Sequence, residues 1–338
     1  MPHSDIVYVD DHEPGITRRK VRHGWGYWDA DGKRVTDRDE IDRLNRIALP
    51  PAYTQAWFCP DPRGHIQATG YDDRNRKQYR YHPGFREAQE AAKYDRCTGF
   101  GEALPKLRAK VENDLKLRGL CKEKAVAAVV RLLDLGTIRV GNEAYAQANK
   151  SFGATTLRKR HARVTGQKLR LQFRAKSGKL RVMTITDGSL SRFVKRVQDL
   201  PGQHLFRWVD EAGAAHPVTS TDVNAYIRDA TAQDFTAKHF RTWSASVLAF
   251  EALAGASAYL GLNAMLDPVT QALGNTPTIA RKSYVHPRLI DLAKDRDAQA
   301  AFRAGLHLPR TTRYLNRYER GLIAFLDEGE GAPHAKAA

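Results

Sequence analysis

Apolar and polar residues alternate most clearly in the middle of the chain. Between residues 169 and 173 every second residue is apolar, and the same alternation returns at Leu180 and Val182. A period of two is typical of strands that bury one face, and Lys176-Ser177-Gly178-Lys179 between them has the composition of a turn. This segment is therefore predicted to be a β-hairpin with lysines at its tip.

A helical period dominates the chain from about Phe85 onward. Residues 85–93 and 104–115 repeat apolar side chains at helical intervals, and residues 122–135 are rich in Ala, Val and Leu with no breaker before Gly136. The last of these segments is expected to be a buried helix. By the same criteria, six further helices are predicted at residues 190–200, 221–230, 237–260, 267–273, 287–294 and 313–327.

The residues before Phe85 are rich in aromatic side chains and turn signals. Gly24-Trp25-Gly26-Tyr27-Trp28 is followed by Asp31-Gly32, and Pro50-Pro51 lies further along. Short runs bounded by such signals are typical of strands and hairpins. We therefore expect an α+β protein with three parts: a small β-rich domain over residues 1–90, a larger, mainly α-helical domain with a short antiparallel β-sheet over 91–327, and a disordered Gly/Ala-rich tail over 328–338.

The chain is strongly basic. Its 338 residues include 55 Lys and Arg against 38 Asp and Glu, a formal net charge of +17. This balance favours nucleic acid as the partner over the alternatives, a generic basic protein or a membrane-surface binder. No apolar run approaches the roughly 18 residues of a membrane span, and the first residues lack the regions of a signal peptide. We expect no membrane partner and a cytoplasmic, nucleoid-associated location.

Motifs for nucleotide or metal chemistry are missing from the sequence. No Gly-x-x-x-x-Gly-Lys-Ser/Thr loop and no His-Glu-x-x-His occurs, and Gly24-x-Gly26 lacks the rest of a dinucleotide-binding fingerprint. The sequence also lacks a Cys-x-x-Cys pair, which would indicate a zinc site. The chemistry of a DNA-acting enzyme would then come from side chains alone, and we expect no cofactor and no metal.

Several polar residues are candidates for this chemistry, although each has an ordinary structural explanation by itself. Arg139 lies between two apolar residues, where a salt bridge would explain it. Arg241 and Lys238 are three residues apart on one helical face, opposite apolar residues, as on a solvated basic face. Lys176 at a hairpin tip is typical of a solubilising lysine, and Tyr284, after a helix start at Thr-Pro, is typical of a half-buried tyrosine.

Taken together and in chain order, five residues resemble the active-site set of type IB DNA topoisomerases of the small bacterial and poxvirus-like kind, and more distantly that of tyrosine recombinases: Arg139, Lys176, Arg241, Asn275 and Tyr284. The resemblance extends beyond the site. Residues 66–82, IQATGYDDRNRKQYRYH, look like the DNA-clamping segment of this family, and residues 15–18 and 47–53 fit its small domain. The resemblance reaches to about residue 326.

The resemblance implies that the two domains form a C-shaped clamp around duplex DNA and that a monomer relaxes supercoiled DNA without ATP or metal. Tyr284 would attack a backbone phosphorus to form a 3′-phosphotyrosyl bond, after which the duplex swivels and is rejoined. Arg139 and Arg241 would stabilise the charge of the transition state, because guanidinium groups offer paired donors and stay charged. Lys176 would be the general acid for the leaving 5′-oxygen. The proton acceptor for Tyr284 stays open.

The resemblance also bears on binding. The family usually carries histidine where Asn275 stands, and an amide donates a hydrogen bond without titrating, so we expect Asn275 to act as a donor rather than as an acid or base. DNA contacts are implied for five further residues: Lys238, Tyr145, Gln78, Tyr79 and Lys77.

Two other functions remain as alternatives. A tyrosine recombinase would share this chemistry but exchange strands within a tetramer. Recombinases typically place histidine three residues before the second arginine, where this chain has Lys238, and the β-rich domain fits a topoisomerase clamp better. A noncatalytic architectural DNA-binding protein is favoured only by Asn275, since the other catalytic positions of the family are intact.

Overall fold

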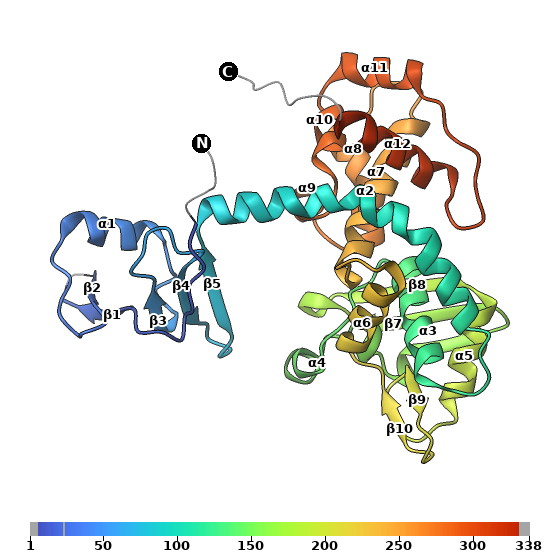
Figure 1. The fold of residues 1–338 in the computed structure, drawn as a ribbon, viewed down its shortest axis with the longest axis horizontal. Coiled ribbons are helices and arrows are strands. Elements are labelled where there is room, and N and C mark those ends of the chain that lie inside the picture. The colour runs from blue at the N-terminus through green and yellow to red at the C-terminus, as the bar shows by residue number, and fades with distance from the viewer. Residues whose placement is uncertain (1–5, 23, 331–338) are drawn as a thin grey trace. The chain divides into compact units, whose positions relative to one another are not determined.

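The computed structural model of the chain describes residues 6–22 and 24–330 (Figure 1). The chain divides into two compact units, Met1–Lys93 and Tyr94–Ala338. The boundary between the units falls inside helix α2, Pro83–Asp114. This single helix contains most of the two segments, 85–93 and 104–115, for which helical periodicity was predicted. The fold is α+β, as predicted, with an antiparallel sheet in the small first unit and mostly helices in the larger second one.

The first unit is built on a five-stranded antiparallel sheet with the strand order β2-β1-β3-β4-β5. Its strands are β1 Ile16–Val21, β2 Gly24–Trp28, β3 Thr54–Phe58, β4 Ile66–Tyr71 and β5 Lys77–Tyr81. Helix α1, Arg38–Arg46, which the sequence pattern did not predict, buries Leu44 in the core beside Phe58. β5 is an edge strand, and Tyr79 and Tyr81 on one of its faces are exposed.

The second unit is mainly helical. Its helices are α3 Lys122–Gly136, α4 Glu143–Asn149, α5 Gly188–Gln198, α6 Ser220–Thr231, α7 Ala237–Gly255, α8 Leu262–Leu273, α9 Pro277–Ser283, α10 Pro287–Leu292, α11 Arg296–Gly305 and α12 Arg317–Glu330. Three short 3-10 turns are η1 Ala154–Thr156, η2 Lys159–His161 and η3 Lys176–Gly178. The prediction that α3 is buried is confirmed. Within residues 6–22 and 24–330, no helix is long and apolar enough to cross a membrane.

Several helix boundaries differ from the predictions. α7 ends at Gly255 instead of 260, α8 begins at Leu262 instead of 267, and α12 begins four residues later than predicted, at Arg317. α4 and α11 were not predicted. Both are short and begin at side-chain caps, Asn142 and Asp295, rather than in a long apolar period. α12 continues through residues 328–330, the first residues of the predicted disordered tail, and the rest of that tail, 331–338, lies outside the described residues.

The predicted hairpin is confirmed. β7, Lys168–Arg174, pairs antiparallel with β8, Leu180–Thr186, and on its other side with β6, Ala162–Thr165. Helices α3 and α5 pack against this sheet (Figure 1). The strands β9 Arg207–Val209 and β10 Ala215–Pro217 form a separate pair.

The pairing of β8 with β7 decides which face of β8 is buried. Leu180 and Val182 expose 64% and 50% of their surface, while Arg181 and Ile185 lie on the inner face. Residues directly opposite each other on antiparallel strands share a face, and β8 pairs Arg181 with the buried Phe173. Both alternating sets of β8 contain two apolar residues, so the period alone was ambiguous and the pairing with β7 decided it.

Candidate active site

The candidate site is built where the C-termini of α3 and α8 meet. Each helix is followed by a residue in the left-handed conformation, Thr137 with φ 52° and Gly274 with φ 66°. The Thr137 hydroxyl donates a hydrogen bond to the Ala272 carbonyl, 2.7 Å away, and so joins the two helix ends. The negative ends of two helix dipoles, with their unpaired carbonyls, thereby come together. Arg139 lies two residues after the first of these caps, and Asn275 follows the second directly.

Arg139 is held on two sides. Its half-buried guanidinium donates to the Oδ1 of Asn275 at 3.3 Å. Its carbonyl accepts a hydrogen bond from the Ala154 N–H at 2.8 Å, and a Cβ on Gly153 would lie only 2.6 Å from that carbonyl oxygen, so only glycine fits there. No carboxylate pairs with Arg139 in the part of the chain that the structure describes, so a salt bridge does not explain this arginine.

Arg241 is buried in α7, with 4% of its surface exposed. A solvated basic face shared with Lys238, which would explain this arginine by itself, is excluded because only Lys238 is exposed. The Arg241 guanidinium donates to the carbonyls of Thr137 and Leu273, one at each helix end. These carbonyls give a buried charge the polar partners that it needs. The central carbon of the guanidinium lies 4.7 Å from the centre of the Tyr284 ring.

Tyr284 follows α9, whose N-terminus is capped by Thr276 as the Thr-Pro sequence predicted. Its side chain is half-buried. Burial by itself raises the pKa of the Tyr284 hydroxyl. Four contributions outweigh it: the charge of Arg241, a hydrogen bond from that arginine, the charge of Arg139 and a contact with Asn275. The pKa therefore lies below its ordinary value of about 10. The site stabilises the phenolate more than water does.

Asn275 connects Arg139 to Tyr284. Because its Oδ1 accepts from Arg139, the orientation of its amide is defined and Nδ2 is the atom left to donate. Nδ2 is buried and lies near enough to the Tyr284 hydroxyl to contribute to the lowered pKa there. That contact is weak, because Nδ2 has no acceptor in good hydrogen-bond geometry among the described residues.

Lys176 is exposed at the hairpin tip, in η3. It lines a cavity of about 240 Å³ in which no carboxylate is found among the described lining residues and every charged side chain is cationic: Arg139, Lys176, Lys179, Arg181 and Arg241. Tyr284 and Asn275 do not line this cavity but contact Arg241 and Arg139, which do. A pocket whose charged side chains are all positive attracts dense negative charge, so the cavity suits a phosphate group.

Arg181 is a residue of this cavity that the sequence pattern did not single out. The signal was present, since on the inner face of β8 an arginine stands in line with two apolar residues, Met183 and Ile185. The equally regular alternation of Leu180 and Val182 concealed it.

A larger cavity of about 800 Å³ shares Thr137, Arg181 and Ala272 with the site. Its walls carry arginines but also five carboxylates: Glu112, Asp134, Asp187, Glu251 and Glu319. Mixed charge suits a polyanion poorly, so we place the candidate site at the smaller cavity.

In the second unit, two residues are predicted to contact DNA. Lys238 is exposed in the first turn of α7. Tyr145 is half-buried in the first turn of α4, and its N–H donates to the capping side chain of Asn142 at 2.9 Å. The next residue after that cap, Glu143, is held by an ion pair with Arg158 and by a 3.0 Å contact with the Nε2 of His204, which fix the start of α4.

In the first unit, β5 carries the other predicted DNA contacts. Lys77 and Tyr79 share one face of the strand and Gln78 lies on the other. Tyr79 exposes 41% of its surface, and the Gln78 amide donates to Asp72. The Lys77 ammonium lies 2.7 Å from the Oδ2 of Asp11, so its charge is already paired in this structure.

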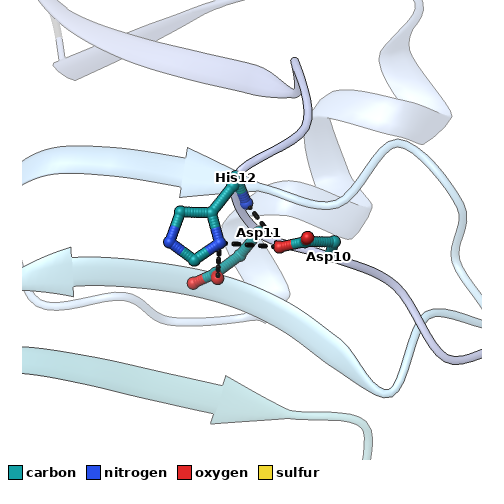
Figure 2. Close-up of side chains that lie close together, drawn as sticks. All are labelled: Asp10, Asp11 and His12. Atoms are coloured by element: carbon teal, nitrogen blue, oxygen red, sulfur yellow. Dashed lines mark hydrogen bonds and ion pairs between the residues drawn. The ribbon is translucent and has the colours of Figure 1, made fainter.

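Asp11 belongs to a small cluster with Asp10 and His12 (Figure 2). The Nδ1 of His12 lies 2.7 Å from the Asp10 carboxylate and 3.7 Å from that of Asp11. Within the described residues this is the one group of three potential metal ligands. Lys77 already neutralises Asp11, although the contact is not aligned as a hydrogen bond, and a divalent cation here would lie beside an ammonium group. We interpret the cluster as an ion-pair network.

Comparison with protein-family models matches two parts of the chain. Residues 82–293 match the catalytic core of eukaryotic DNA topoisomerase I, and residues 24–72 match the N-terminal domain of bacterial DNA topoisomerase IB. The chain therefore belongs to the type IB DNA topoisomerase family of DNA-binding isomerases. It is 32% identical to DNA topoisomerase 1B of Acanthamoeba polyphaga mimivirus over 243 residues, which are 71% of this chain and 72% of the viral protein.

Solved structures of XerH, a site-specific recombinase bound to its difH substrate, have a more distant similarity. The post-cleavage complex is 16% identical with a TM-score of 0.38 and covers 60% of this chain. The pre-cleavage complex is 17% identical with a TM-score of 0.37 and covers 57%. The chain spans about half the length of these recombinase chains, 51% and 52%.

Proposed function

We propose that this chain relaxes supercoiled duplex DNA by cutting and rejoining one strand through a 3′-phosphotyrosyl intermediate. The observation that carries the proposal is the placement of Arg241 on the Tyr284 ring, together with the lowered pKa of the tyrosine hydroxyl. A buried guanidinium beside a tyrosine whose hydroxyl loses its proton more easily than a free phenol is what a tyrosine nucleophile for a phosphodiester requires. Membership of the family supports the same reaction.

In the first step, the Tyr284 oxygen forms a bond to phosphorus while the bond from phosphorus to the 5′-oxygen breaks. The phenolic proton is lost during the attack, and the lowered pKa reduces the cost of losing it. Lys176 gives a proton to the departing 5′-oxygen, which would otherwise leave as an alkoxide. Rejoining is the reverse reaction. Because one phosphoester replaces another in each step, the cycle consumes no ATP.

Negative charge grows on the non-bridging oxygens of the phosphate during both steps. In the proposed mechanism, Arg139 and Arg241 meet this charge, since forked guanidinium donors match phosphate oxygens. The Nδ2 of Asn275 has no well-aligned acceptor among the described residues, and a phosphate oxygen would satisfy it. Asn275 therefore fits the role of an uncharged donor. Removing one such preorganised donor typically costs about 10²–10³ in rate.

We further propose that the chain acts as a monomer and that each of its two units contacts the duplex. Lys238 and Tyr145 would contact DNA from the second unit, and Gln78 and Tyr79 from the first. Lys77 would exchange the Asp11 carboxylate for a phosphate. Such exchanges release counterions from DNA, so binding should weaken steeply as salt rises.

Plasmid relaxation in EDTA, with Tyr284→Phe beside wild type, tests the proposal. The wild type should relax the plasmid and leave a covalent adduct on a denaturing gel, while Tyr284→Phe should bind DNA but form no adduct. Tyr318→Phe, which alters another half-buried tyrosine of the same unit, is the matched control and should behave as wild type. An adduct retained in Tyr284→Phe would refute the assignment. A wild type without adduct would indicate an architectural DNA-binding protein, and a tetramer on DNA would indicate a recombinase.

A further inference from the structure

Arg181 occupies a position where the strand pattern calls for an apolar residue. It lies on the inner face of β8, in line with Met183 and Ile185, and opposite the buried Phe173 on β7. A cation there is costly unless polar groups compensate it. Residues that break the local pattern in this way are expected at functional sites.

The contacts of Arg181 are with the helix ends on which the site is built. Its Nη2 lies 2.5 Å from the carbonyl oxygen of Ala272, at the end of α8. The same nitrogen lies 3.4 Å from the Gly136 carbonyl and 3.4 Å from the Thr137 hydroxyl, at the end of α3. Its Nη1 lies beside Gly274, because a Cβ on that glycine would be 3.1 Å away. Arg181 thus links one strand to both helix ends.

The charge of Arg181 has no carboxylate partner among the described residues. Burial, and then the charge of Arg139, lower the pKa of its guanidinium. Its Nε is buried without a hydrogen-bond partner, so it is not presented to a ligand. The carbonyls at the negative ends of two helices are the groups that compensate it. Arg181 is therefore placed to hold protein segments together rather than to bind DNA through Nε.

The segment that Arg181 holds is the hairpin that carries Lys176. β7 and β8 are paired along their whole length up to Arg174 and Leu180, and in the turn the Ala175 N–H donates to the Lys179 carbonyl at 2.8 Å. The tip is exposed, and no described side chain fixes Lys176 directly. The position of the Lys176 ammonium relative to Arg139 and Arg241 then depends on where β8 is attached.

We propose that Arg181 is a positioning residue for the reaction: by bridging β8 to the C-termini of α3 and α8, it sets the hairpin at the depth at which Lys176 reaches the leaving 5′-oxygen. This inference rests on the general-acid role proposed for Lys176. Displacing a proton donor by about 1 Å can slow a reaction on the order of 10²-fold. Complete loss of a general acid slows it by about 10²–10⁴-fold, so the displacement should cost no more than the loss of Lys176 itself.

Single-turnover cleavage by excess enzyme tests the proposal with two DNA substrates, one ordinary and one in which the leaving 5′-oxygen is sulfur. A thiolate leaves without an acid, so a defect that acts through Lys176 disappears on the sulfur substrate. Arg181→Ala should cleave ordinary DNA on the order of 10²-fold more slowly than wild type and the sulfur substrate at nearly the wild-type rate. In a Lys176→Ala background, the same change should add little.

Two variants control for charge and for folding. Lys168→Ala removes an exposed cation from the opposite end of the same hairpin and should leave cleavage unchanged. Arg181→Lys keeps the charge but cannot bridge both helix ends, so it should remain slow on ordinary DNA and be rescued by sulfur. It also carries the test if thermal melting shows that Arg181→Ala does not fold.

The outcomes separate this inference from the proposed function. If Lys176→Ala is not rescued by sulfur, the general-acid role of Lys176 fails. If Lys176→Ala is rescued and the Arg181 variants are not, only the positioning role fails, and Arg181 acts on the phosphate or on the fold. Full activity of Arg181→Lys on ordinary DNA would also overturn the bridging role, because charge alone would then suffice.

Discussion

Gly153 packs so closely against the backbone of Arg139 that one added methyl group is expected to move the candidate site. A Cβ at position 153 would lie 2.6 Å from the Arg139 carbonyl oxygen and 2.6 Å from the Gly141 nitrogen. Gly153 has φ −135° and ψ −178°, an extended conformation that alanine adopts without strain, so the effect of Gly153→Ala is steric. Ordinary contact begins near 3.4 Å, which means that the two segments must separate by roughly 0.8 Å.

This separation acts on the hydrogen bonds that hold the Arg139 segment. The Arg139 carbonyl accepts from Ala154 at 2.8 Å, and the Val140 carbonyl accepts from Thr155 at 2.7 Å. We expect Gly153→Ala to lower the free energy of unfolding by about 1–3 kcal/mol, as overpacking typically does. Because a displacement near 1 Å in a catalytic group can cost on the order of 10²-fold, single-turnover cleavage should slow by that order.

Chemical denaturation and single-turnover cleavage, measured on the same preparations, check both numbers. Gly255→Ala is the matched control, since nothing lies within 4 Å of a Cβ at that position, at the end of α7. It should be neutral or add about 0.4–1 kcal/mol of stability, with no change in cleavage. If Gly153→Ala loses stability but cleaves at the wild-type rate, the placement of the Arg139 backbone does not limit the reaction and the argument is refuted.

Three further predictions concern charge. Arg241→Met should raise the pKa of Tyr284, because the guanidinium beside the ring lowers it, and the pH–rate profile of cleavage should shift to higher pH; an unmoved profile would show that another group controls the titration. Burial lowers the pKa of His286 to about 4 from 6.5, so the unfolded chain binds a proton that the folded one does not. The free energy of unfolding therefore falls as the pH drops from about 6.5 towards about 4, by about 2 kcal/mol between about pH 7 and pH 5. Denaturant titration of His286→Asn at the two pH values should show a decrease smaller by this amount. Arg108→Met should leave two buried carboxylates unpaired and cost about 3–5 kcal/mol by denaturant titration, whereas Lys110→Met, which breaks a half-exposed pair on the same helix, should cost about 0–1 kcal/mol.

The elements with a long, regular period could be predicted from the sequence. The buried helix α3 and the hairpin with Lys176 at its tip were predictable, because a continuous apolar run and a clean alternation each favour one backbone geometry. The cap of α9 at Thr276 was predictable from the Thr-Pro pair. The family was also recognisable from the sequence, because the order and spacing of five polar residues along the chain can be compared without knowing their contacts.

Which face of each element is buried, and what surrounds the reactive groups, depends on packing between segments that are distant in the sequence. A period states that a strand or helix has two faces but not which one finds a partner, so the inner-face position of Arg181 and the burial of Arg241 could not be read from it. Arg241 is buried and Arg181 half-buried because two helix C-termini, far apart in the sequence, meet and offer carbonyls to them. The lowered pKa of Tyr284 has the same origin, since the arginines that cause it come from distant segments that only this meeting of helix ends brings together.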